Sequence, residues 1–298
     1  MKIKNKKLAI IAAAILAVFL ILFIIFHARS PVLIVTDLAF IPLYGAQRIR
    51  SETLRSSLIL FRPVKTVIVA DDAGNDIIRI AISDTSSRPY CVIFPLRFAP
   101  SARLYREQNP GIPVVLLGSR YSEDTVLSAV GGDASDYFIF TTDIDAEFYR
   151  AGMIAAALDR DKDGKIFVFV ESHIQTQARE AFLRAINSHE KPLETFFFTS
   201  YSRVPDYPDL SCVILAGTGA EYMERDSGVP VIFFTWIDPA LLPRDIVVVI
   251  NDSPWVQAVQ AVRMVSGRVS NGLIKSEFKF INGKNIDRRT LRKMQKQG

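Results

Sequence analysis

Ten short apolar runs recur along residues 32–250 and alternate with segments of helical periodicity. Most runs are apolar at successive positions and rich in Val, Ile and Phe, which is typical of strands buried on both faces of a parallel sheet. Between two of them, residues 178–186 place apolar side chains at the i, i+3, i+4, i+7 and i+8 spacing of one helix face. Alternating strands and helices predict an α/β fold with parallel sheets. The ten runs are 32–35, 66–70, 91–94, 114–117, 137–140, 166–170, 194–198, 212–215, 231–234 and 246–250.

Ten strands are more than one doubly wound sheet usually needs. The runs fall into two sets of five, one within residues 32–140 and one within residues 166–250. We therefore expect two Rossmann-like lobes that are joined by short hinge crossings and separated by a cleft. The expected division is 31–142 plus about 252–270 for the N-terminal lobe, 143–251 plus about 271–283 for the C-terminal lobe, and 284–298 for a basic tail.

Residues 1–30 form a separate unit, in which a basic start precedes the uninterrupted apolar run Leu8–Phe26. At 1.5 Å per helical residue this run would span about 28 Å, close to the thickness of a bilayer core. A cleaved signal peptide is the alternative, but the run is longer than a usual signal core, and residues 27–29 are a poor cleavage site. We predict an uncleaved transmembrane helix at a bacterial cytoplasmic membrane, with the N-terminus inside and the body in the periplasm. The basic residues before the run are Lys2, Lys4, Lys6 and Lys7.

Charge is distributed unevenly, although the net charge of the chain is only +5. Residues 1–29 hold five basic groups and no acid, and residues 275–298 hold eight basic groups against two acids, so the middle carries a net charge of −6. An acidic body with basic ends is not typical of a nucleic-acid-binding protein, and we expect no nucleic-acid partner. The basic tail is either a solvated end, which we favour, or a segment that lies on anionic lipid headgroups.

Two cysteines in an exported chain of this length mean that the fold does not depend on disulfides. Cys91 and Cys212 each lie in an apolar run that predicts a strand. Two buried free thiols are therefore the favoured interpretation, and a Cys91–Cys212 bridge is the alternative.

Polar and aromatic residues follow the predicted strands and supply the candidate binding site. Ligands of open parallel sheets bind beyond the carboxyl ends of the strands, and two facing lobes direct those ends into one cleft. Carboxylates, amides, arginine donors and aromatic faces together suit a small hydroxylated ligand. Residues at strand ends also cap the helices that follow, which is the alternative role for each one. The candidates are Asp37, Phe40, Asp72, Arg97, Arg120, Tyr121, Asp143, Glu171, Gln177, Thr218, Trp236, Asp238 and Asn251.

Asp143 and Asp145 lie between an apolar run and an amphipathic helix. We expect Asp145 to cap the helix and Asp143 to point into the cleft as a ligand contact. No further carboxylates or histidines are spaced nearby to complete a metal site, so no metal is expected.

Two other segments resemble ligand loops but lack essential positions. Residues 159–170 match the first half of a calcium-binding EF-hand, but Val170 stands where a bidentate glutamate is needed, so we expect a helix-to-strand turn. Residues 217–222 lack the third glycine of a dinucleotide fingerprint, so no cofactor is expected. No activated nucleophile accompanies the three histidines, and we expect no enzymatic activity.

Five segments in order along the chain resemble type I periplasmic binding proteins. Residues 137–158, YFIFTTDIDAEFYRAGMIAAAL, are similar to the crossing between the lobes of that family. Residues 164–186 are similar to the first strand and helix of its second lobe, and CVILAGTGAEYM, GVPVIFFTWIDP and IVVVINDSPWVQAVQAV are similar to its later strands and return crossing. The glycines favour the basic-membrane-protein branch, whose members bind nucleosides; sugar-binding members share the fold. The chain departs from the family in its anchor and in having no lipidation cysteine near that segment.

The resemblance implies a membrane-tethered solute-binding protein that closes by hinge motion on a sugar or nucleoside. It also implies an ABC-type permease as the partner of the closed form. The alternative is a membrane-anchored sensory or protein-interaction module whose cleft has lost its ligand. The anchor favours this alternative, since a protein fixed to the bilayer cannot carry solute freely.

Overall fold

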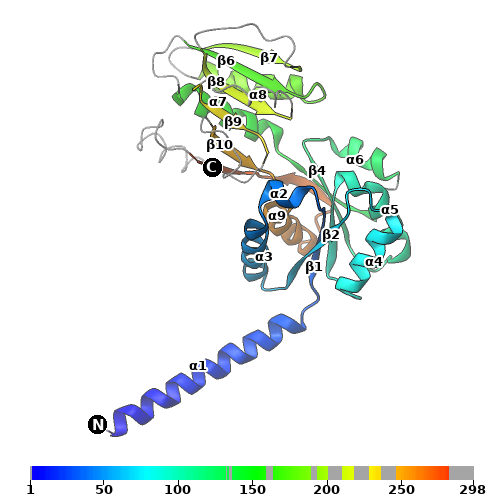
Figure 1. The fold of residues 1–298 in the computed structure, drawn as a ribbon, viewed down its shortest axis with the longest axis vertical. Coiled ribbons are helices and arrows are strands. Elements are labelled where there is room, and N and C mark those ends of the chain that lie inside the picture. The colour runs from blue at the N-terminus through cyan, green and yellow to red at the C-terminus, as the bar shows by residue number, and fades with distance from the viewer. Residues whose placement is uncertain are drawn as a thin grey trace.

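The computed structural model describes residues 2–131, 133, 136–158, 164–188, 193–200, 210–217, 228–235 and 246–281. Side chains are described from residue 13 onward within these ranges, except at 19 and 246. Two α/β lobes follow one N-terminal helix (Figure 1). The two-lobe architecture predicted from the sequence is therefore confirmed.

The first lobe is built on a six-stranded sheet in which all the described neighbours are parallel. The strand order is β11-β5-β4-β3-β1-β2, so β2 and β11 are its two edges. The strands are β1 (Val32–Asp37), β2 (Val64–Val69), β3 (Cys91–Pro95), β4 (Val114–Ser119), β5 (Phe138–Thr142) and β11 (Asn271–Ile274).

Helices cover both faces of this sheet. Side chains alternate along β1: Val32 and Ile34 belong to the core beneath α3 and α9, and Leu33 and Val35 belong to the core beneath α4, α5 and α6. Continuous apolar runs thus bury both faces of the strands, as the pattern predicted. The helices are α2 (Phe40–Tyr44), α3 (Ala46–Leu60), α4 (Asn75–Thr85), α5 (Ala99–Gln108), α6 (Glu123–Val130) and α9 (Pro254–Ser266), with a 3₁₀ turn, η1 (Leu96–Phe98), before α5.

The second lobe has its own six-stranded sheet, in the order β12-β10-β9-β8-β6-β7. Only β12 runs antiparallel to its neighbour among the described pairs. Helices α7 (Ile144–Leu158) and α8 (Gln175–Asn187) pack on one face and share a core with β6, β8, β9 and β10. The strands are β6 (Lys165–Val170), β7 (Glu194–Phe198), β8 (Leu210–Ala216), β9 (Val231–Phe233), β10 (Ile246–Asn251) and β12 (Glu277–Phe280).

The chain passes between the lobes three times, from β5 to α7, from β10 to α9 and from β11 to β12. The ten predicted strands are all present, but β11 and β12 are not among them. The expected division placed residues 271–283 in the C-terminal lobe, whereas residues 271–274 pair with β5 in the first sheet and 277–280 pair with β10 in the second. The third crossing therefore lies at residues 275–276.

Cys91 and Cys212 are buried free thiols in different sheets, which confirms the favoured interpretation of both. Burial raises the pKa of Cys91 to about 12 and also raises the pKa of Cys212 well above its usual range. Both thiols are therefore protonated and unreactive in the folded protein at neutral pH.

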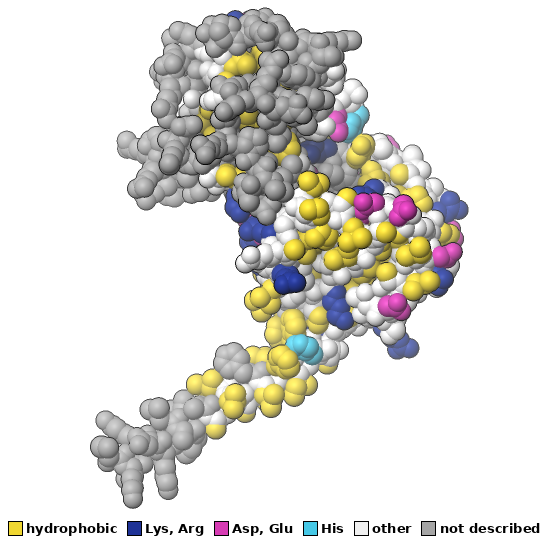
Figure 2. Space-filling model, in the orientation of Figure 1, with side chains coloured by type: hydrophobic (Ala, Val, Ile, Leu, Met, Phe, Trp, Pro, Cys, Tyr) yellow, Lys and Arg dark blue, Asp and Glu magenta, His cyan; other side chains and the backbone are white. Residues whose placement is uncertain are grey.

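The N-terminal helix α1 (Lys2–Ala28) projects away from the first lobe, and Figure 2 shows apolar side chains along its exposed surface. Leu16 and Leu20 are examples, with exposed fractions of 71% and 59%. Within the part of the chain whose side chains are described, no helix is long and apolar enough to cross a membrane. The structure therefore does not support the transmembrane segment predicted over residues 8–26, which stays a prediction from the sequence.

Gly152 lets α7 approach α8 closely. A Cβ atom at this position would lie 2.8 Å from the Ala185 Cβ atom and 2.9 Å from the Phe182 carbonyl oxygen. Gly152→Val should lower the free energy of unfolding by about 2–3 kcal/mol, because the two helices would have to move apart. Urea unfolding followed by circular dichroism measures this loss. Gly111→Val is the control, since no atom lies within 4 Å of that Cβ position; equal midpoints for the two variants would contradict the close packing.

Candidate functional site

The carboxyl ends of the two sheets meet at a stacked pair of rings. Tyr121 follows β4 in the first lobe and His173 follows β6 in the second, and their ring centroids lie 4.6 Å apart with an interplanar angle of 8°. The His173 Nδ1 atom lies 3.5 Å from a carboxylate oxygen of Glu171. The two rims therefore face each other at this point, and three side chains that can contact a polar ligand lie together there.

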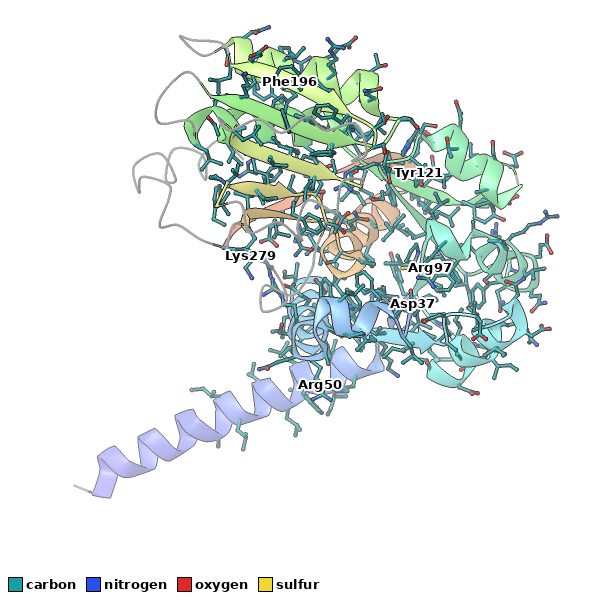
Figure 3. The ribbon with its side chains drawn as sticks, turned by 45° about the horizontal axis from the view of Figure 1, so that its top comes forward. Asp37, Arg50, Arg97, Tyr121, Phe196 and Lys279 are labelled. Carbon is teal, nitrogen blue, oxygen red and sulfur yellow. The ribbon has the colours of Figure 1, made fainter. Side chains whose placement is uncertain are left out.

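A charged pair occupies the adjacent strand ends of the first lobe. Asp37 ends β1 and is buried, and one of its oxygens forms an ion pair with Arg97, which lies in η1 after β3 and is about half exposed. The other Asp37 oxygen accepts a hydrogen bond of 2.8 Å from the Phe40 backbone N–H. Figure 3 shows Asp37, Arg97 and Tyr121 on the side of the first lobe that faces the second. Arg97 thus has a fixed position and keeps donors exposed.

An aromatic cluster borders this pair. Phe40 stacks on Tyr44 and Trp255, with ring centroids 5.4 and 5.9 Å away. The Tyr44 hydroxyl donates to the Ser253 Oγ atom over 2.7 Å, and burial raises the Tyr44 pKa to about 12. The Trp255 indole N–H donates to the Thr66 hydroxyl over 3.1 Å. Phe40 was predicted as a site residue, whereas Tyr44 and Trp255 were not.

One buried arginine connects all three crossings between the lobes. The Arg120 Nε atom donates to Glu147 of α7 over 3.1 Å, and its Nη2 atom lies 3.4 Å from Asp252, between β10 and α9. Ser276, between β11 and β12, donates to the other oxygen of Glu147. Arg120 was predicted as a ligand contact; its described partners belong to the hinge instead.

The charge states of this cluster follow from its burial. Burial lowers the pKa of Arg120, but the Glu147 and Asp252 carboxylates raise it by more, so the guanidinium stays charged. Burial raises the pKa of Glu147, and the Arg120 charge and the Ser276 hydrogen bond offset part of that rise. The carboxylate therefore depends on the guanidinium to remain ionised inside the protein.

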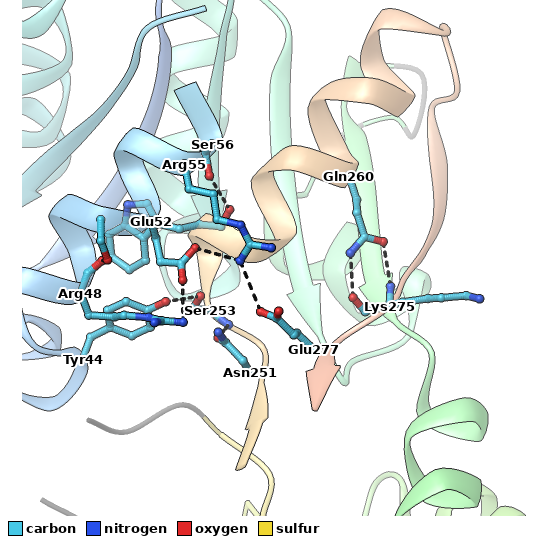
Figure 4. A network of polar contacts seen from close by, with 12 residues as sticks. Tyr44, Arg48, Glu52, Arg55, Ser56, Asn251, Ser253, Gln260, Lys275 and Glu277 are labelled. Carbon is cyan, nitrogen blue, oxygen red and sulfur yellow. Dashed lines mark hydrogen bonds and ion pairs between the residues drawn. The ribbon is translucent and has the colours of Figure 1, made fainter. Parts of the chain in front are cut away.

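A second polar network connects the first lobe to the third crossing (Figure 4). Glu52 of α3 binds Arg48 at 2.6 Å, and Arg55 lies 3.6 Å from Glu52 and 3.8 Å from Glu277 of β12. The Gln260 side chain exchanges two hydrogen bonds with the Lys275 backbone. These contacts hold the end of β11 and the start of β12 against α3 and α9. A cavity of about 450 Å³ lies beside them.

Asp143, and not Asp145, caps the helix that follows β5. Helix α7 begins at Ile144, and Asp143 caps it by accepting a 3.0 Å hydrogen bond from the Ala146 N–H. Asp145 lies inside the first turn and forms an ion pair of 2.6 Å with Arg184 on α8. The prediction that Asp145 is the cap was wrong by two residues, because the helix starts earlier than its apolar periodicity suggested.

The remaining predicted residues are divided between the cleft, the surface and undescribed segments. Asn251 ends β10, is fully buried and accepts a hydrogen bond from the Ser253 N–H over 3.2 Å. Asp72 and Gln177 are exposed, in the turn after β2 and on α8. Thr218, Trp236 and Asp238 lie outside the described residues. Within the described ranges no group of three or more His, Cys, Asp and Glu side chains could hold a metal ion.

Sequence reasoning missed the residues whose role depends on side-chain direction. Glu147 is an acid in the first turn of an otherwise apolar helix face, and that position could have marked it as a buried partner for a cation. Tyr44 ends the short helix after Asp37, and Trp255 lies in the first turn after Ser253, so aromatic residues close to strand ends were a usable signal. No local pattern singles out Ser276.

Comparisons with known proteins show a shared fold. No family model matches the chain, and no curated protein sequence matches it. A solved structure of a transcriptional activator of the comK gene from Bacillus halodurans matches with a TM-score of 0.57 and 13% identity, covering 90% of this chain and 95% of that one.

Two solute-binding proteins share the same architecture. A periplasmic solute-binding protein of an ABC transporter from Actinobacillus succinogenes 130z, with bound D-allose, has a TM-score of 0.54 and 12% identity and covers 86% of this chain and 98% of that one. A sugar-binding protein of a sugar ABC transporter from Bacillus halodurans has a TM-score of 0.53 and 12% identity, with coverage of 87% and 99%. At these identities the similarity establishes the two-lobed fold that sugar-binding proteins and a transcriptional activator have in common.

Replacing Arg120 tests the hinge cluster. Arg120→Met should lower the free energy of unfolding by about 3–5 kcal/mol at pH 7, because Glu147 would stay buried without its cation. Burial then keeps the Glu147 pKa above its unfolded value, so the protein gains stability as that carboxyl is protonated, and the loss should shrink as the pH falls towards 5. Urea unfolding at several pH values measures both effects.

Arg184→Met is the matched control for Arg120→Met, since Arg184 forms an ion pair that is open to solvent. Its unfolding midpoint should stay close to that of the wild type at every pH. Equal effects of the two substitutions, or a loss that does not depend on pH, would contradict a buried Arg120–Glu147 pair.

Proposed function

We propose that the chain is an extracytoplasmic solute-binding protein that closes on a small hydroxylated ligand, a sugar or a nucleoside. The observation that carries this proposal is the Tyr121–His173 contact, through which the strand-end rims of the two lobes meet. Arg97 supplies donors, Glu171 supplies acceptors, and Phe40, Tyr121 and His173 supply ring faces. Hydroxyl groups and a sugar ring need this combination.

Closure would follow from contacts that the ligand makes with both lobes at once. A ligand favours the closed state only by the free energy that it gains there and lacks in the open state. Arg97 and Phe40 belong to the first lobe, and Glu171 and His173 belong to the second, so a bridging ligand would gain contacts on closure. The three crossings at Glu147, Asp252 and Ser276 are the places where the backbone would bend.

The α1 helix would tether this body to the membrane, and an ABC-type permease would receive the closed form. The support for the tether is the apolar run at residues 8–26, the basic residues before it and the exposed apolar side chains described on α1. The permease is inferred from the solute-binding proteins that share the fold. A tethered protein would deliver ligand to permeases near it in the same membrane.

A second candidate function is a sensory or protein-interaction module with a degenerate cleft. One observation favours it: the Tyr121–His173 stack and the Arg120–Asp252 pair already satisfy several site residues with one another. A ligand would have to displace the ring stack before it could bridge the lobes. A ligand screen separates the two functions.

Thermal unfolding of the full chain with a panel of sugars and nucleosides tests ligand binding. A true ligand at 100 times its Kd should stabilise the protein by about 2.7 kcal/mol and raise the melting temperature by several degrees. Arg97→Ala and His173→Ala should abolish this ligand-dependent rise, whereas Arg103→Ala should retain it because Arg103 lies in an exposed pair on α5. A panel without any shift would favour the interaction module.

Alkaline extraction of membranes tests the tether. The wild-type chain should stay in the membrane pellet, and a Leu16→Lys/Leu20→Lys variant should appear in the supernatant, since each central lysine costs about 2.5–3.5 kcal/mol in a bilayer. Ala13→Leu is the apolar control and should stay in the pellet. Extraction of the wild-type chain, or a mature N-terminus beyond residue 28, would contradict a retained anchor.

A further inference from the structure

Exposed apolar side chains are concentrated on one part of the first lobe. Outside α1, fourteen large hydrophobic residues of the described chain are exposed, and nine of them lie between residues 38 and 80. Scattered exposed hydrophobic residues are normal, but a cluster of this kind marks an interaction surface. The nine are Leu38, Leu43, Leu54, Leu58, Ile59, Phe61, Ile68, Ile77 and Ile80. We call them the β2-edge patch, except Ile59, which lines the cavity beside α9.

The β2-edge patch surrounds an edge strand and the helices on its two sides. Ile68 belongs to β2, which ends the strand order of the first sheet, and Leu54 and Leu58 belong to α3. Helix α4, on the other side of the sheet, exposes Ile77 and Ile80. Figure 2 shows apolar side chains gathered on this face of the first lobe.

A groove runs between α3 and β2 within the patch. It has a volume of about 530 Å³ and is lined by both elements, including Leu54, Val64 and Ile68. Among the described residues of its lining, Arg50 is the one that carries a charge. An apolar side chain of a partner therefore fits the groove better than a charged one.

The size of the patch is comparable to that of a protein interface. Its eight residues have exposed fractions between 37% and 66%, which amounts to several hundred Å² of apolar surface. A standard interface buries about 800 Å² on each partner, and the largest apolar patch on a typical monomer is about 300–600 Å². The β2-edge patch can therefore supply most of one side of a stable contact.

The charges around the patch argue against a lipid surface as its occupant. Binding to anionic headgroups needs a cluster of unpaired basic side chains. Here Arg79 lies 3.6 Å from Asp76, and the Lys65 ammonium donates to the Thr85 carbonyl over 3.1 Å. Both cations are thus held by groups of their own lobe, and Arg50 alone among the described groove lining does not make a cluster of the kind that headgroups need.

The edge strand itself points to a second copy of the chain. An edge strand presents unpaired backbone N–H and C=O groups on its open side, and a lysine that projects across the edge usually blocks it. Lys65 is bound to Thr85 at the end of α4 and leaves the edge open. A two-fold axis through the edge places each element of the patch next to the same element of the second chain, so the same apolar patch is buried on both chains.

We infer that two copies of this chain associate through their β2-edge patches about a two-fold axis beside β2. Leu54 and Leu58 lie one helical turn apart and form a seam with the same residues of the other α3. Leu or Ile side chains of each copy enter the groove of the other. The opposite edge of the sheet, β11, carries the third crossing, so the pairing leaves the second lobe free to move.

Disulfide cross-linking of the full chain in its membrane tests the pairing. Leu54→Cys and Leu58→Cys should each give a covalent dimer under mild oxidation, because each residue would lie near its own copy. The native thiols do not interfere, since Cys91 and Cys212 are buried. Leu273→Cys is the control: it is 59% exposed on the opposite edge strand and should give no dimer. Equal cross-linking at Leu273, or none at Leu54 and Leu58, would overturn the proposal.

Mass measurement by light scattering, on the full chain in nanodiscs large enough for two copies, provides a second readout. The wild type and Leu273→Glu should have the mass of two chains, and Leu54→Glu/Leu58→Glu should have the mass of one at the same concentration. A wild-type monomer would overturn the proposal, and so would a double variant that stays dimeric, which would place the contact elsewhere, for example in α1. Ligand binding to each copy is independent of this result.

Discussion

A single buried guanidinium holds the three crossings between the lobes together. Arg120 comes from the end of β4, and through Glu147 and Asp252 it contacts two crossings directly and the third through Ser276. A buried ion is stable only while its partners remain in place, because each of them has given up its water. The relative position of the two sheets, and hence the shape of the cleft, depends on this cluster.

The fold was largely predictable because its strands are buried on both faces. A run such as 32–35 is apolar at every position, and that pattern leaves little choice other than a central strand. Strands β11 and β12 escaped prediction since they are four residues long and contain Asn271, Glu277 and Lys279. They lie next to the hinge at the margins of their sheets, where exposure permits polar residues and weakens the periodic signal.

The site was less predictable than the fold. Asp37, Arg97 and Tyr121 lie at or just after the carboxyl ends of β1, β3 and β4, a position that the order of strands and helices alone decides. Whether a side chain then reaches the cleft, the hinge or a helix cap depends on directions that no sequence pattern shows. Arg120 contacts the hinge for this reason, and Asp143 caps α7 because that helix begins at the next residue, Ile144.

The last two strands, β11 and β12, belong to different sheets, and this also constrains how the chain can fold during synthesis. The first sheet lacks its last strand until residues 271–274 have emerged, and the second lacks its last strand until residues 277–280 have emerged. Most of the chain must therefore be synthesised before either sheet can add its last strand. A truncation that removes only the last thirty residues would make β5 and β10 the new edge strands of the two sheets, although it would spare every residue of the cleft.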